Sequence, residues 1–292
     1  MTFDIVLCVR SRSEIPSLDS IRSVLLPPQN ALKPDSEKVE TFEHMNKATG
    51  VYFVWAYSRQ EAGTEVHGAP HLFDSGLMVH VNFGRPSYFA HECFDTLQSI
   101  AKKLGLYLFY SQPLSPSEVP EPSTSQMLEQ WSRINTDSVQ RVRKDRGGRI
   151  RFIPKEKLDS VWSYNSHKHQ LYKMMGERYF IPNTVFAVER TGSLDERCYT
   201  CCGWPDFRPE VFPQVEYVIV RRDDRSTAYG LVGLGDVQEV LRESYLEASE
   251  PIRHILLEHP SEVQIAEIRA KVALRDEEIK VVPFDSIVDV PP

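Results

Sequence analysis

Near its C-terminus the chain carries a glutamate and a lysine with the spacing found in one class of metal-dependent nuclease. Glu278-Ile279-Lys280 matches the E-x-K half of a restriction-type site. Such sites pair this half with an acidic residue on a neighbouring strand to hold Mg²⁺. The best upstream acid, Asp206, lies far away in the sequence. A three-residue match is common by chance, so a metal-dependent nuclease is kept as an alternative.

A second pattern could bind zinc or exchange electrons. Cys198 and Cys201 form a C-x-x-C, and Cys202 follows directly. A structural zinc site needs four ligands, and the nearest histidines, His167 and His169, lie well upstream. A strand in this region would instead place small thiols in the core. We expect buried thiols and keep a zinc protein as an alternative.

A glycine-rich stretch precedes one of the predicted helices. Gly230, Gly233 and Gly235 have the wrong order for a dinucleotide-binding loop, and no P-loop lysine follows. Asp236 also places a negative charge where a phosphate would sit. This pattern indicates a strand that leaves through a glycine turn, and we expect no cofactor.

The clearest charge pattern lies in the last fifth of the chain. A helix from Asp236 to about Ser249 would place five carboxylates within roughly an 80° arc, at about 100° per residue. These residues are Asp236, Glu239, Glu243, Glu247 and Glu250. Such a row is either an ordinary solvated face or a docking ridge for a cationic partner, which would steer fast association.

Charge is uneven along the whole chain. From Asp236 onward there are thirteen acidic residues against six lysines and arginines. The segment 133–157 has nine lysines and arginines against three acids. Because no aromatic residues alternate with these basic residues, we expect a solvated helix end there rather than an RNA-binding site.

Bulk composition narrows the class of protein. The chain has 292 residues, 41% hydrophobic residues and a net charge of −7, so nucleic acid and anionic membranes are poor default partners. No apolar run reaches the ~18 residues of a spanning helix. The N-terminus does not resemble a secretion signal. Five cysteines, an odd number, favour reduced thiols and the cytoplasm.

The first part of the chain predicts a sheet with helices on it. We expect strands at 3–9, 51–57, 77–81 and 106–110, helices at 17–26, 36–47 and 88–104, and a loop at 61–75. The helix ending at Gly105 is the best defined, because its apolar and charged side chains fall on opposite sides at 100° per residue.

The second part is richer in strands. We expect helices at 124–143, 158–175, 236–249 and 260–273, and strands at 149–153, 184–189, 197–201, 215–221, 229–232, 252–257 and 280–284. The fold class is therefore α+β, with mixed or antiparallel sheets flanked by helices. The proline- and serine-rich segment 112–125 predicts a boundary between an N-terminal part, 1–115, and a C-terminal part, 123–292, packed as one compact unit.

Some of these residues resemble a known family. They are Val81-Asn82-Phe83, Gly84-Arg85-Pro86 and Tyr88-Phe89, then Trp162 with Asn165, and then Gly203-Trp204-Pro205 before the strand near Val215 to Val220. The set is similar to immunity proteins of bacterial polymorphic-toxin and type VI secretion systems, above all the immunity protein 52 family. The likeness spreads over about residues 50–235.

This resemblance implies an α+β protein that binds a nuclease toxin and blocks it in the cytoplasm of the producing cell. It brings no catalytic residues. We therefore expect a non-enzymatic inhibitor whose partner is a toxin with a basic nucleic-acid-binding surface, a restriction-endonuclease-like effector. The acidic row from Asp236 to Glu250 is the expected contact surface. The alternatives are a metal-dependent enzyme, nuclease-like or zinc-binding, and a scaffold subunit.

Overall fold

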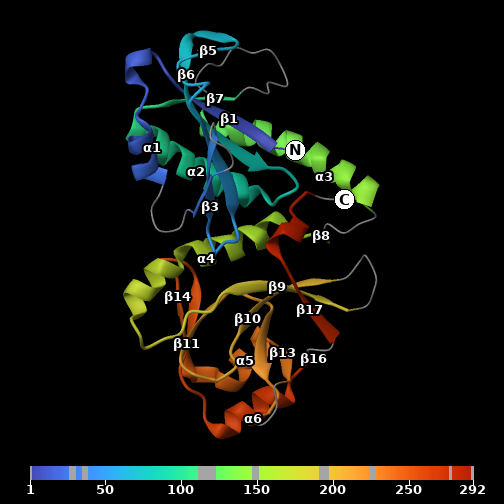
Figure 1. The fold of residues 1–292 in the computed structure, drawn as a ribbon. Helices are drawn as coiled ribbons and strands as arrows, with labels where there is room; N and C mark the ends of the chain where they lie inside the picture. Colours follow the sequence, from blue (N-terminus) through green and yellow to red (C-terminus); the bar gives the residue numbers. More distant parts are fainter. Residues whose placement is uncertain are drawn as a thin grey trace. The chain divides into compact units, whose positions relative to one another are not determined.

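The structure is a computed structural model of the chain. It describes residues 2–25, 31–34, 39–110, 123–146, 151–190, 197–223, 228–275 and 278–290. Helices and both mixed and antiparallel sheets are present, which confirms the α+β class (Figure 1). Residues Met1–Ile150 form one compact unit, unit 1, and Arg151–Pro291 form another, unit 2.

Unit 1 is built on a seven-stranded sheet. Its elements are β1 (Thr2–Val9), η1 (Arg12–Glu14), α1 (Leu18–Leu25), β2 (Ala31–Pro34), β3 (Val39–Met45), β4 (Tyr52–Ser58), β5 (Glu65–Val66), β6 (Ala69–Asn82), α2 (Ser87–Leu104), β7 (Tyr107–Tyr110) and α3 (Thr124–Arg146). The strand order is β2-β3-β4-β6-β1-β7, with β5 paired to β6. Because β1 is antiparallel to both β6 and β7, these two run parallel and α2 connects them.

Helix α2 confirms the strongest prediction from the sequence. Its apolar side is buried, from Tyr88 and Phe89 to Ile100 and Ala101. Gly105 ends it in the left-handed conformation, with φ of +68°. Phe94 of this helix meets Phe3 of β1 with ring centroids 6.1 Å apart, so the helix is packed on the sheet.

Two predictions in unit 1 are wrong. Residues 39–45 form β3 rather than a helix, since Val39, Thr41 and the neighbouring residues pair antiparallel with β4 in a hairpin. Residues 36–38 of that prediction lie outside the described residues. The predicted loop 61–75 contains β5 and the start of β6, which turn through Gly68 at φ of +86°. In both places pairing with the next strand of the chain outweighs local sequence preference.

Unit 2 contains a six-stranded sheet and two smaller ones. Its elements are β8 (Arg151–Phe152), α4 (Lys155–Met175), β9 (Thr184–Glu189), β10 (Cys198–Gly203), β11 (Glu210–Pro213), β12 (Tyr217–Arg221), β13 (Tyr229–Gly233), α5 (Leu234–Leu241), η2 (Arg242–Ser244), β14 (Tyr245–Ala248), β15 (His254–Leu257), α6 (Glu262–Ala270), β16 (Leu274–Arg275), β17 (Ile279–Val282), η4 (Phe284–Ser286) and β18 (Ile287–Val288). The three sheets have the orders β16-β13-β12-β10-β9-β17, β11-β15-β14 and β18-β8. Only β10–β12 pair in parallel within the described part of the large sheet, which makes it mixed.

Helices α5 and α6 cover one face of the large sheet. Val218 and Val232 point into a cluster with Val237 of α5 and Ile268 of α6. The three-stranded sheet adds Phe212 and Ile255 to the same cluster. This cluster is the main core of unit 2.

The boundary between the units differs from the predicted one. Residues 112–122 of the predicted linker lie outside the described residues. Helix α3 belongs to unit 1, because Trp131 stacks on Phe83 and Asn135 accepts a hydrogen bond from the Gly84 amide at 2.7 Å. The division into compact units falls after Ile150, later than the predicted boundary at 115–123. The packing of the two parts as one compact unit stays a prediction.

Gly76 offers a test of the unit 1 sheet. It has φ of +81°, and a Cβ there would lie 2.6 Å from the Ser58 carbonyl oxygen. Gly68 has a similar φ of +86° with open space around it. We expect Gly68→Ala to cost about 1 kcal/mol for the backbone conformation alone. Gly76→Ala should cost about 1–3 kcal/mol more because of the clash. Urea unfolding measures both, and equal losses would contradict the close approach.

Candidate partner-binding surfaces

The structure separates the residues of the predicted nuclease site. Glu278 accepts a hydrogen bond from the Arg275 amide at 2.8 Å and so closes a local turn. Asp206 lies 3.5 Å from the Arg221 guanidinium of β12. Within the described ranges, no three or more His, Cys, Asp or Glu side chains form a group that could hold a metal ion. The metal-dependent nuclease stays an alternative prediction.

The cysteine motif lies in β10, as predicted, and its thiols do not converge. Cys198 and Cys201 are three residues apart on a strand, so their side chains point to opposite faces of the sheet. Cys201 and Cys202 are fully buried, and Cys198 is half-buried. Burial raises the pKa of Cys198 to about 11 and that of Cys201 to about 12. Protonated thiols on two faces are core side chains rather than zinc ligands.

The acidic segment does not form the single helix that was predicted. Helix α5 starts after Gly233 and ends at Leu241, because Arg242 adopts φ of +47°. After the 3₁₀ turn, residues 245–248 form β14 and pair with β15 in an antiparallel hairpin. The predicted helix to Ser249 is therefore wrong, and the five carboxylates do not share one helix face.

The five carboxylates lie on several elements. Asp236 and Glu239 are on α5, and the Lys271 ammonium lies 3.8 Å and 3.0 Å from them. Glu247 is on β14, 3.5 Å from the Arg253 guanidinium. Glu250 follows the strand and is exposed. Glu243 lies in the 3₁₀ turn, and its side chain is outside the described set.

The outer edge of β14 is open. In the three-stranded sheet the order is β11-β15-β14, so one long side of β14 has no partner strand in the described part of the chain. Leu246 on this strand is 63% exposed, and its neighbour Glu247 is also exposed. An apolar side chain beside carboxylates on a free sheet edge is a feature of protein-binding surfaces.

The other face of the large sheet carries a second apolar cluster, which we call the outer sheet face, and five of its nine residues are buried. It consists of strand residues only: Val185, Ala187, Tyr199, Cys201, Tyr217, Ile219, Leu231, Leu274 and Ile279. Val281 extends it at the edge strand β17 and is 53% exposed. Helices α5 and α6 pack on the opposite face, so nothing from those helices shields these residues.

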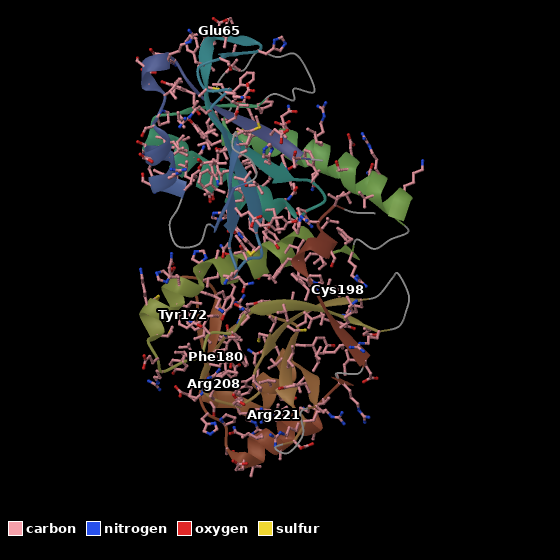
Figure 2. The ribbon with its side chains drawn as sticks, in the orientation of Figure 1. Glu65, Tyr172, Phe180, Cys198, Arg208 and Arg221 are labelled. Atoms are coloured by element: carbon pink, nitrogen blue, oxygen red, sulfur yellow. The ribbon has the colours of Figure 1, made fainter. Side chains whose placement is uncertain are left out.

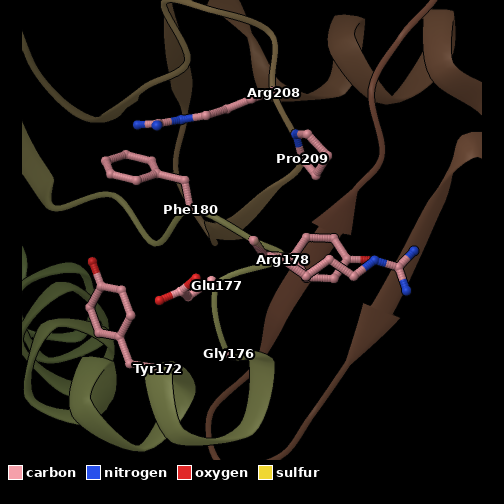
Figure 3. Close-up of a pocket in the computed structure, with 8 residues that line it drawn as sticks. Tyr172, Gly176, Glu177, Arg178, Phe180, Arg208 and Pro209 are labelled. Atoms are coloured by element: carbon pink, nitrogen blue, oxygen red, sulfur yellow. The ribbon is translucent and has the colours of Figure 1, made fainter.

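A cavity of about 280 Å³ lies where the end of α4 meets the start of β11. It is lined by Tyr172, Gly176, Glu177, Arg178, Tyr179, Phe180, Arg208 and Pro209 (Figure 3). The Arg208 guanidinium lies 3.7 Å from the centre of the Phe180 ring, and the two lie close to Tyr172 in Figure 2. Arg178 stacks on Tyr179 and pairs with Glu258. The rings of Phe180 and Tyr179 therefore already contact arginine side chains of this chain, and this leaves them less available to a cationic ligand.

A buried carboxyl group lies beside this junction. Glu210 of β11 is fully buried, and neither of its carboxyl oxygens has a hydrogen-bond partner in the described structure. Burial raises the pKa of Glu210 to about 9, against the opposing effect of the nearby Arg208 and Lys168. Burial also lowers the pKa of Lys168 to about 8. Glu210 is therefore protonated at neutral pH.

The raised pKa of Glu210 predicts how the stability of the fold changes with pH. Its folded pKa of about 9 exceeds the ordinary value of 4.5, so its contribution to stability is present below pH 4.5 and is lost as pH rises toward 9. We expect Glu210→Gln to remove this loss and to stabilise the fold at pH 8 by about 1–3 kcal/mol. Denaturant unfolding between pH 5 and 9 measures it.

The exposed Glu177 on the same cavity supplies the control for this experiment. Glu177→Gln removes an exposed carboxyl group and keeps the buried one, so the difference between the two variants isolates the effect of Glu210. An identical pH dependence in wild type and Glu210→Gln would contradict the buried, protonated carboxyl.

The residues that carry the family resemblance have structural roles here. The amide of Asn135 donates to the Arg85 carbonyl at 2.9 Å, and its oxygen accepts from the Gly84 amide, so α3 fixes the turn. The Asn165 side chain donates a hydrogen bond to the Thr184 carbonyl and accepts one from the Thr184 amide. Trp204 is fully buried and donates to the Arg208 carbonyl at 2.7 Å.

Comparison with protein-family models, with curated proteins and with solved structures found no match. Among the described residues, no helix has the length and apolar character needed to cross a membrane. Sequence reasoning missed the free edge of β14, the cavity and Glu210. The only available signal for Glu210 was an acid inside the apolar run Pro209 to Pro213.

Proposed function

We propose that this chain is a protein inhibitor that neutralises a toxin by direct binding. The observation that carries the proposal is the free edge of β14, where exposed Leu246 lies next to Glu247 and just before Glu250. The apolar side chain supplies contact area. The carboxylates favour a partner of positive charge.

A nuclease toxin fits this surface in charge. Its nucleic-acid-binding channel must be basic, since it binds phosphates. The segment 236–250 carries five acids and a single arginine, Arg242. The resemblance to the immunity protein 52 family points to the same class of partner, a restriction-endonuclease-like effector. In this proposal the chain acts in the cytoplasm of the cell that makes the toxin.

In this proposal different residues determine the binding affinity and the association rate. Exposed ion pairs contribute little to binding strength, since the median is ~0–1 kcal/mol. Their long-range field mainly raises the association rate. Asp236 and Glu239 would therefore steer the toxin, and the edge around Leu246 would hold it.

The outer sheet face favours a second candidate, an assembly subunit. On the side away from α5 and α6, Val281 is exposed, and Tyr217 and Ile219 are partly exposed beside a buried cluster. Aromatic and aliphatic groups of this kind occur at the centres of protein interfaces. A stable complex that forms through this face with a protein other than a toxin would favour the second candidate.

The first test uses the protein encoded beside this chain's gene as the candidate toxin. Expressed alone in a bacterial host, it should stop growth and degrade DNA. Co-expression with this chain should restore growth. A purified pair should form a complex whose association rate falls as salt rises, because the attraction is electrostatic.

Charge reversal tests the steering role. Replacing Glu239, Glu247 and Glu250 by lysine should slow association at low salt by about tenfold or more. The control replaces Glu61, Glu65 and Asp95 of unit 1 by lysine, which changes the net charge equally. Stopped-flow or surface-based kinetics measure both sets. Growth arrest without rescue by the wild-type chain would contradict the inhibitor function, and equal rates for both sets would contradict steering by this segment.

A further inference from the structure

We propose that β14 is the site where an extended segment of the toxin adds as a further strand to the sheet β11-β15-β14. This inference rests on the proposed inhibitor function. It goes further in naming the mode of binding and the kind of sequence that fits.

The geometry of the edge supports strand addition. β14 pairs with β15 on one side, with Tyr245 opposite Leu257 and Ala248 opposite His254. On a strand, alternate backbone N–H and C=O groups point to the two sides. The groups on the outer side of β14 meet no strand in the described chain, so they form a template for a fourth strand.

The side chains of β14 define what would fit. Leu246 and Ala248 lie on one face of the small sheet, together with Leu256. Tyr245 and Glu247 lie on the other face, together with Leu257 and Ile255. Cross-strand neighbours interact most strongly when apolar residues meet apolar residues and opposite charges meet. The matching segment therefore carries an apolar residue facing Leu246 and a lysine or arginine facing Glu247.

The surroundings also select a basic segment. Glu250 lies just beyond the end of the strand and is exposed, and within the described structure it makes no hydrogen bond or ion pair. Among the described residues, Glu247 pairs with Arg253 at 3.5 Å, a long and exposed contact that an incoming cation can replace. A strand in which basic and apolar residues alternate could therefore contact Leu246 with an apolar side chain and place its basic side chains near Glu247 and Glu250.

The exposure of Leu246 argues against a purely protective edge. Proteins protect edge strands by keeping them short or by placing charge or proline on them, and β14 is four residues long and carries Glu247. Here the middle of the strand carries a leucine that is 63% exposed. Leu246 is thus the anchor that a bound strand would bury.

Amide hydrogen exchange tests this mode of binding directly. The free chain and its complex with a catalytically inactive form of the candidate toxin are compared residue by residue by NMR. Strand addition should slow exchange of the outward-facing β14 amides by at least about tenfold, because they become hydrogen-bonded. The amides that already face β15 should change much less.

Two matched variants complete the experiment. Leu246→Lys should weaken the complex by at least about tenfold, by removing the apolar anchor and adding a like charge to a basic segment. The control is Val263→Lys on α6, which replaces an apolar side chain that is 76% exposed and should leave affinity unchanged. Circular dichroism shows that both variants are folded.

The outcomes separate the two proposals. Slowed β14 amides together with weakened binding by Leu246→Lys support strand addition. A tight complex in which β14 amides exchange as in the free chain overturns strand addition and leaves the inhibitor function standing. No complex with the toxin overturns both.

Discussion

The pairing of β14 with β15 is the interaction on which the proposed binding surface depends. Residues 245–248 would otherwise extend α5, and their carboxylates would form one ridge on a helix. The hairpin instead turns the chain at Arg242 and brings Tyr245 onto the main core of unit 2. As a result, a leucine and a glutamate stand on an open sheet edge, where a partner's backbone can take part in binding.

The rest of unit 2 supports this edge. β15 is anchored on its other side by β11, and Ile255 and Leu257 are fully buried in the core with α5 and α6. Tyr179 and Arg178 both reach Glu258, directly after β15. A rigid central strand with a short free neighbour is a suitable base for strand addition, since little ordering is required before contact.

Sequence patterns predicted elements whose structure is decided locally. Helix α2 was predicted correctly because its apolar residues recur at helical spacing and Gly105 ends it. The sequence predicts buried thiols in β10, and the burial of both Cys201 and Cys202, which point to opposite faces, shows that both faces of this strand are covered. The sequence patterns at 39–45 and 245–248 predict helices, although these residues form strands, because pairing with the next strand in a hairpin decides their structure. Val237, Leu241, Tyr245 and Ala248 recur with a helical period, and only the pairing with β15 overrides it.

The sequence predicts the negative charge of the candidate site, but it does not predict that the site is the edge of a sheet. The acidic residues 236–250 stood out by composition, whereas the free edge depends on the order of three strands that lie apart in the sequence. Glu210 could not be recognised either, because β11 is a four-residue strand that contains a glutamate and a proline. Burial by its neighbours, rather than local sequence, keeps its carboxyl group neutral.

Backbone chemical shifts of the free chain across residues 234–258 test the central claim most directly. We expect helical Cα shifts as far as Leu241, strand shifts from Tyr245 to Ala248, and fast amide exchange on one side only of that strand. Helical shifts that continue without interruption to Ser249 would contradict the open edge, and with it this account of how the chain holds a partner.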